Sequence, residues 1–177
     1  MARRRGRQEP LPQQVEAALG LGRGERVLAA ARTTDQEWLV TTSWRVAVVT
    51  ADGDVQLARP WWHVDGGAWD PDTESLEVSW VDGSDGARLG LPSPGRVPET
   101  LHERVQASVV LMRHLDLGPG RRVRVAIRKD LQDRSLLEQV LPGPGTRTTD
   151  PELVAAVVRA RAELRDQAGM GPVPAAE

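Results

Sequence analysis

The sequence predicts a mainly β domain of the α+β class, and three patterns lead to this prediction. Between residues 26 and 91, short apolar or alternating segments are separated by glycine, aspartate and proline turns, as in antiparallel sheets. From Pro98, apolar residues recur at helical spacing as far as Leu115, which predicts a helix continuing to Gly118. The rest of the chain contributes one alternating segment and one capped helix. We therefore expect a seven-stranded antiparallel structure with a capping helix, followed by a C-terminal strand and helix.

A short helix is expected before the strands, because Leu11, Val15 and Leu19 fall on one side of a helix that Gly20 can end in a left-handed conformation. The clearest strands are expected over residues 26–32, 37–42, 45–49, 55–59, 76–81 and 87–91. Within residues 60–70, a pair of adjacent glycines fits a bulge or sharp corner between two short strands.

The C-terminal part has its own pattern. Three apolar residues alternate with three arginines, so this strand should have one apolar and one cationic face. The residues concerned are Val123, Val125 and Ile127 on one face and Arg122, Arg124 and Arg128 on the other. After a loop over residues 141–150, Asp150 can cap a helix that begins at Pro151.

These elements predict a division of the chain into four parts. Residues 1–10 are expected to form a disordered basic tail, and residues 11–117 a folded domain that includes the first helix. Residues 118–168 should form a strand and helix packed on that domain. Residues 169–177 should form a second disordered tail.

The composition excludes several kinds of chemistry. The chain has no Cys, which removes disulfides, thiolate metal sites and cysteine nucleophiles. No apolar run approaches the length that spans a membrane, and the basic start is not followed by an apolar stretch, so we expect a cytoplasmic protein. No serine lies in a nucleophile-elbow pattern. We therefore predict no catalytic residue, no cofactor and no metal, and a protein that is not an enzyme.

The tryptophans divide into two groups. The chain has six Trp but no Phe or Tyr, so most of Trp38, Trp44, Trp69 and Trp80 are expected to supply aromatic bulk to the core. Trp61 and Trp62 are adjacent, and neighbouring residues on a strand point to opposite faces. One of the two should point inward and the other should be at least partly exposed, where it could anchor a partner protein.

The order of these elements resembles the pleckstrin-homology (PH-like) fold, and more closely the bacterial PH-like domains of uncharacterised actinobacterial proteins. The residues that carry the resemblance are Gly24-Glu25-Arg26-Val27-Leu28, Trp38-Leu39-Val40-Thr41-Thr42, Pro60-Trp61 to Val64, and Trp69-Asp70. The resemblance covers about residues 21 to 115. It implies a seven-stranded barrel open at one end, with a ligand mouth formed by the loops at 33–36, 50–54 and 82–86.

The charge of these loops argues against a lipid ligand. Family members that bind lipid phosphates have Lys and Arg there, whereas this chain has Asp35, Asp52, Asp54, Asp82 and Asp85. Residues 33–92 contain eleven acids and three arginines, which should repel phosphoinositides, nucleic acid and anionic membranes. Residues 113–134 contain seven bases and three acids, so the positive charge lies in the C-terminal part.

The leading hypothesis is a non-enzymatic protein-interaction or scaffold domain that contacts another protein through Trp61 and Trp62 or through the acidic mouth. One alternative is a nucleic-acid or anionic-surface binder that uses the Arg-rich strand together with the N-terminal arginines. These arginines are Arg122, Arg124 and Arg128 in the strand and Arg3, Arg4, Arg5 and Arg7 in the tail. A third hypothesis is a hydrolase or metal enzyme, for which His63, Asp65 and His114 follow the order of a two-His, one-carboxylate site.

Overall fold

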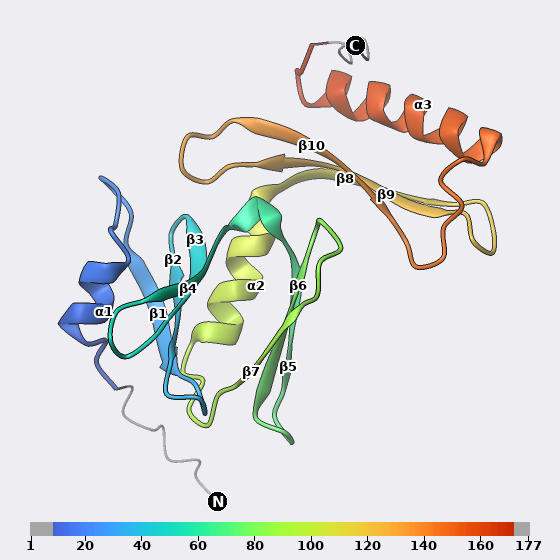
Figure 1. Ribbon diagram of the computed structural model, residues 1–177. Coiled ribbons are helices and arrows are strands. Elements are labelled where there is room, and N and C mark those ends of the chain that lie inside the picture. The colour runs from blue at the N-terminus through green and yellow to red at the C-terminus, as the bar shows by residue number, and fades with distance from the viewer. Residues whose placement is uncertain (1–8, 172–177) are drawn as a thin grey trace, which may run out of the picture. The chain divides into compact units, whose positions relative to one another are not determined.

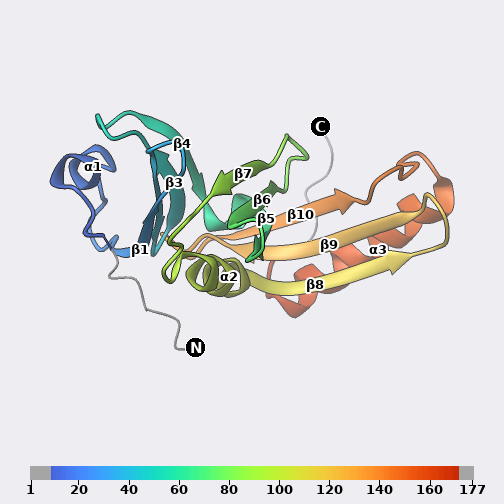
Figure 2. The same cartoon turned by 90° about the horizontal axis from the view of Figure 1, so that it is seen from below.

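The computed structural model describes residues 9–171 and is shown in Figures 1 and 2. The chain divides into two compact units, residues 1–106 and 107–177, and the boundary falls in the last turn of a helix. The described residues form three antiparallel sheets, none of which closes into a barrel, and few helices. The prediction of a mainly β protein is confirmed.

The first sheet has the order β1-β2-β3-β4, made from consecutive strands. These strands are β1 (Val27–Arg32), β2 (Trp38–Thr42), β3 (Arg45–Val49) and β4 (Val55–Pro60), at the positions that the turn residues predicted. Helix α1 (Gln13–Ala18) lies beside this sheet (Figure 1), and Val15 and Leu19 join its core. The sheet residues of that core are Ala30, Trp38, Val40, Ala47 and Val49. All five residues of β2 are buried, and α1 covers the face that carries Trp38 and Val40.

A partly buried ion pair joins the segment before β1 to the turn between β2 and β3. The carboxylate of Glu25, 2% exposed, accepts hydrogen bonds from Arg45 Nε at 2.9 Å and Nη2 at 3.1 Å, and from the Thr42 hydroxyl at 2.7 Å. Arg45 Nη2 also donates to the carbonyl of Leu19 at the end of α1, at 2.6 Å. Burial raises the pKa of Glu25, but the hydrogen bonds from Arg45, Thr42 and the Gly22 N–H outweigh it and leave that pKa below its ordinary value.

The second sheet has the order β5-β6-β7. Its strands are β5 (Val64–Asp70), β6 (Ser75–Trp80) and β7 (Ala87–Gly90). The pairing of β5 with β6 shifts between Val64 and Gly66, so the expected bulge is present, and a 3-10 turn, η1 (Trp61–His63), forms the corner before it. Helix α2 (Val97–Ser108) packs on this sheet, since a Cβ atom placed on Gly67 would lie 2.5 Å from Leu101 Cδ2.

The helix predicted from Pro98 to Gly118 is wrong in its second half. Helix α2 ends at Ser108, and the chain continues directly into β8 (Val109–Asp116), whose residues alternate between half-buried and exposed. The apolar residues of this segment fit both a helical and a strand period. Pairing with β9 (Arg122–Lys129) decides between them, because it satisfies the backbone of β8 along its length.

The second unit is a three-stranded sheet covered on one face by helix α3 (Pro151–Gln167), as Figures 1 and 2 both show. Its order is β10-β9-β8, and β10 (Leu136–Pro142) is a strand that the sequence did not predict, because its residues do not alternate. The strand β9 and the helix after Asp150 were predicted and are confirmed. The Leu153 N–H donates to Asp150 Oδ1 at 3.0 Å, which is an N-cap. The core contains Val123, Val125, Ile127, Leu153, Ala160 and Leu164.

Candidate binding site

The corner between β4 and β5 separates the two adjacent tryptophans. Trp61 is 0% exposed, and its indole N–H donates to the carbonyl oxygen of Thr42 at 2.9 Å. Trp62 is half-buried, and its ring meets the His63 ring edge-on at a centroid distance of 5.6 Å. One tryptophan is therefore inside and the other partly exposed, as expected, but a 3-10 turn rather than strand alternation separates them. Trp61 has no exposed surface to offer a partner in this structure.

Next to this corner, His63 lies between a cation and an anion. Arg59 Nη1 lies 2.8 Å from His63 Nδ1, and Asp82 Oδ2 lies 3.3 Å from His63 Nε2. The guanidinium of Arg59 also contacts Asp82 Oδ2 at 3.1 Å and lies 5.2 Å from the ring centroid of Trp80. The rings of His63 and Trp80 are stacked at 6.5 Å with 18° between their planes. We call Arg59, His63, Trp80 and Asp82 the histidine cluster.

The contacts of the histidine cluster favour a neutral His63. Arg59 Nη1 lies 2.8 Å from Nδ1 and 3.3 Å from Nε2, and its N–H can donate only to a ring nitrogen that carries no proton. Burial and the positive charge of Arg59 lower the pKa of His63, and the negative charge of Asp82 offsets part of this effect. Hydrogen bonds from the Ser84 hydroxyl and N–H, and from Arg59, lower the pKa of Asp82 to about 2.

This arrangement does not match a nucleophilic triad. Both ring nitrogens of His63 already have polar partners, and the hydroxyl of Ser84 donates to Asp82 rather than to the imidazole. The cluster instead joins β4, η1 and the loop after β6 into one contact network. Asp82, expected as part of an open acidic mouth, is held by Arg59 and Ser84.

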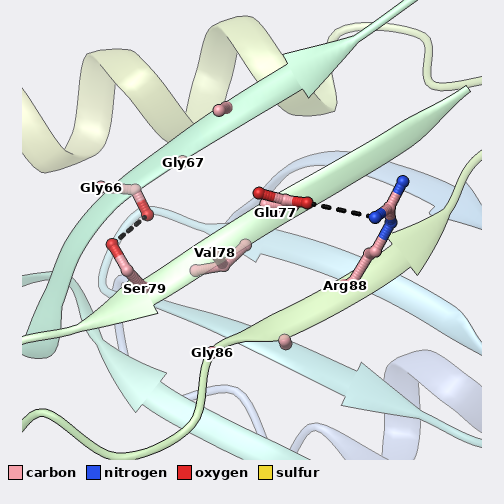
Figure 3. A pocket seen from close by; sticks show the side chains of 9 residues that line it. Gly66, Gly67, Glu77, Val78, Ser79, Gly86 and Arg88 are labelled. Carbon is pink, nitrogen blue, oxygen red and sulfur yellow. Dashed lines mark hydrogen bonds and ion pairs between the residues drawn. The ribbon is translucent and has the colours of Figure 1, made fainter. Parts of the chain in front are cut away.

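A second feature is a hollow on the β5-β6-β7 sheet, shown in Figure 3. Its volume is about 440 Å³, and its lining residues are Gly66, Gly67, Ala68, Glu77, Val78, Ser79, Gly86, Ala87 and Arg88. Most of these residues are glycine or alanine, so few side chains rise from this part of the sheet. We call this feature the glycine hollow.

The polar side chains that line the glycine hollow come from the exposed faces of β6 and β7. Ser79 pairs across the sheet with Gly66, and its hydroxyl lies 3.5 Å from the Gly66 carbonyl oxygen. In the next row Glu77 pairs with Ala68 on one side and with Arg88 on the other. Glu77 and Arg88 form an ion pair at 3.4 Å, and each side chain is 62% exposed. The hollow thus has a backbone floor, one hydroxyl and a charged pair at its rim.

The three glycines of the hollow differ in what the fold requires of them. A Cβ on Gly67 would lie 2.5 Å from Leu101 Cδ2, and a Cβ on Gly86 would lie 2.6 Å from the carbonyl oxygen of Val78. Both positions therefore need glycine for packing. At Gly66 the nearest atom to a Cβ would be the Ser79 hydroxyl oxygen at 3.8 Å, which is ordinary contact. Gly66 also has no positive φ. The fold permits a larger residue at Gly66.

The arginines of β9 occupy three different environments. Arg122 is exposed and pairs with Asp116 through Nε and Oδ2 at 3.0 Å, and Arg124 is half-buried. Arg128 is 2% exposed, and its guanidinium donates to the Ser108 hydroxyl at 3.1 Å from Nε and 2.6 Å from Nη2. The apolar face of β9 packs on α3. The opposite face is not a continuous exposed cationic surface, because Arg128 is buried.

The other predicted motifs have structural explanations. Trp44 packs on the glycine loop that follows α1, since a Cβ on Gly22 would lie 2.7 Å from the Trp44 ring. Within residues 9–171 no group of three or more His, Asp and Glu side chains could hold a metal ion, which gives no support to a site at His63, Asp65 and His114. The N-terminal arginines at positions 3, 4, 5 and 7 lie outside the described residues.

Comparison with known proteins adds no family. No protein-family model matches the sequence, and no curated protein is similar to it. Across residues 9–171, no helix has the length and apolar character needed to cross a membrane. The function must therefore be argued from the geometry of the histidine cluster and the glycine hollow.

Sequence reasoning identified the tryptophan corner but not the glycine hollow. The adjacent glycines of β5 are visible in the sequence, where they indicate a bulge. The signal that could have located the hollow is the pairing of β5 with β6, which places Gly66 beside Ser79. That register depends on the bulge itself, so the sequence pattern alone did not define it.

Proposed function

We propose that the chain is a non-enzymatic protein-interaction domain and that its first unit has a PH-like fold. Four antiparallel strands, then three, then one helix, in this chain order, support the proposed fold. The single observation that supports the function is the glycine hollow. A glycine inside a strand often marks a bulge or a place where another molecule approaches the backbone closely. Gly66 follows the bulge of β5, but a Cβ there would meet no atom closer than 3.8 Å and its φ is not positive, so the fold permits a side chain at position 66.

The charge of the first unit favours a protein partner over a phosphate-bearing one. Residues 33–92 contain eleven acids and three arginines. Two of these arginines, Arg59 and Arg45, are ion-paired with Asp82 and Glu25, and the third, Arg88, is paired with Glu77. A surface of this kind repels polyanions and attracts basic segments of proteins.

Affinity purification from the native host tests this proposal. The tagged chain should retain a specific partner protein, and Gly66→Val should lose it, because the new side chain would stand in the hollow. Ala58→Val is the matched control, since Ala58 is an exposed strand residue of the other sheet of the same unit, and it should retain the partner.

A further variant separates the two surfaces that could carry the contact. If Trp62→Ala loses the partner and Gly66→Val keeps it, the contact lies at the tryptophan corner rather than at the hollow. If the unmodified chain retains no specific partner, or if the purified protein turns over a substrate, the proposal of a non-enzymatic interaction domain is wrong.

A further inference from the structure

The chemistry of the glycine hollow indicates what kind of partner segment it fits. We infer that the hollow receives an aromatic side chain from a basic segment of the partner protein, an inference that rests on the proposed function and names the chemistry of the partner. Three observations support it. The backbone beside Ser79 has no covering side chain, the residues around the sheet are mostly acidic, and the fold does not require glycine at position 66.

The bare backbone favours an aromatic ring. A strand glycine leaves its backbone and its neighbours without a covering side chain, and an aromatic ring laid across it restores that cover. Here the residues beside Gly66 on the same face are Ser79, across the sheet, and Ala68, two positions along the strand, and neither is large enough to do so.

The polar groups of the hollow suit the same occupant. The Ser79 hydroxyl can accept a hydrogen bond from an indole N–H or a phenol O–H. The guanidinium of Arg88, at the rim and 62% exposed, can stack on the face of the ring. The hollow, at about 440 Å³, has ample room for one aromatic side chain and part of its neighbours.

The charge around the sheet favours a basic segment. Residues 64–91, which contain the whole β5-β6-β7 sheet, include seven acids and one arginine. Arg88 offsets Glu77 at 3.4 Å, and Arg59 of β4 offsets Asp82 at 3.1 Å, which still leaves acids in the majority around this sheet. Lys or Arg residues that flank the aromatic anchor would therefore be attracted, and Asp or Glu residues would be repelled.

Gly66 provides a variant that removes the site and keeps the fold. Valine is favoured in strands, and a Cβ at this position meets no atom closer than 3.8 Å. The Gly66→Val protein should therefore be at least as resistant to urea as the original chain. Loss of binding in a variant of equal or greater stability cannot be attributed to unfolding.

The test uses three short peptides and the amide resonances of the full-length 15N-labelled chain. The probe is Ac-Arg-Gly-Trp-Gly-Arg-NH2, and the comparisons are the same peptide with Ala in place of Trp and with Glu in place of both Arg. The tryptophan probe should shift the amides of Gly66, Ser79 and Arg88 most. The alanine and glutamate peptides should each bind at least about tenfold more weakly, because one removes the buried ring and the other reverses the charge.

The two variants complete the test. Gly66→Val should weaken the tryptophan probe at least about tenfold, and Ala58→Val should leave its affinity unchanged. Equal affinity for the Trp and Ala peptides, failure of the tryptophan probe to bind, or shifts that do not include Gly66 and Ser79 would overturn the aromatic anchor. Equal affinity for the Arg and Glu peptides would overturn the basic segment.

Failure of this inference is distinguishable from failure of the proposed function. If Gly66→Val loses the native partner but the tryptophan probe does not bind the original chain, the partner uses a different chemistry at the same hollow and only the inference is wrong. If the original chain has no native partner, the proposed function is wrong whatever the peptides do.

Discussion

The two adjacent tryptophans should differ sharply in what they contribute to stability, and this difference can be measured. Trp61 is 0% exposed and donates a hydrogen bond to the Thr42 carbonyl oxygen, whereas Trp62 is half-buried. Replacing a fully buried Trp by Ala costs about 3–5 kcal/mol, and the lost hydrogen bond adds about 1 kcal/mol if the carbonyl is left without a donor. We expect Trp61→Ala to lower the free energy of unfolding by about 4–6 kcal/mol, and Trp62→Ala by about 1–2 kcal/mol.

Urea denaturation followed by far-UV circular dichroism is the appropriate assay, because the fluorescence of the six tryptophans would overlap. With a slope of about 2 kcal/mol per molar urea, Trp61→Ala should shift the midpoint down by about 2–3 M. Domains often have only 5–15 kcal/mol of stability, so Trp61→Phe is a milder second variant. It keeps most of the packing, removes the indole N–H, and should cost about 1–2 kcal/mol.

The reasoning would be refuted if Trp62→Ala were the more destabilising of the two alanine variants. It would also be refuted if Trp61→Phe had no measurable cost, since the hydrogen bond to Thr42 would then contribute nothing. Either result would mean that Trp61 is not the residue that holds the corner between β4 and β5.

Three further predictions concern charged and titratable groups. Glu25→Gln should lower the free energy of unfolding by about 2 kcal/mol, because the partly buried Arg45 guanidinium loses its counter-charge; a urea midpoint equal to that of the original chain would contradict this. His63 has a lowered pKa in the folded protein, so the unfolded chain binds its proton more tightly. The free energy of unfolding is therefore highest above pH 6.5, where His63 is neutral in both the folded and the unfolded chain. It decreases as the pH falls from there through the lower pKa of the folded protein. Between pH 7.5 and pH 5 the free energy of unfolding should fall more for the original chain than for His63→Gln. Equal decreases in the two proteins would contradict the lowered pKa of His63. Asp150→Ala should cost about 1 kcal/mol through loss of the N-cap of α3, and removal of the cap without any change in thermal midpoint would show that Pro151 alone suffices to start the helix.

The sequence was a good guide wherever one local signal decided the structure. Turn residues separated β1 to β4, and Asp150 with Pro151 marked the start of α3. The sequence was a poor guide at residues 109–116, where apolar spacing fits both a helix and a strand and where pairing with β9 decides. For the same reason β10 was missed, since its pairing with β9 stabilises a strand without an alternating pattern.

The candidate site was less predictable than the fold. The tryptophan corner could be located from residues 60–62, but the 3-10 turn that buries Trp61 could not. Arg128 seemed equivalent to Arg122 in the sequence, yet one is buried and the other is 70% exposed in its side chain, because burial depends on what packs against each position. The glycine hollow depends on cross-strand register, which is a property of the paired strands rather than of either segment.

Helix α1 has a consequence for any shortened version of this protein. The helix is six residues long, and it covers a sheet face that contains Trp38, Val40, Ala47 and Val49. A version of the chain that begins after residue 20 would expose this face to water as a contiguous apolar patch beside the strand edge of β1. Such patches promote association between molecules. A fragment intended for crystallisation or for binding assays should therefore begin before Leu11. Proteolysis that removes this segment should promote aggregation.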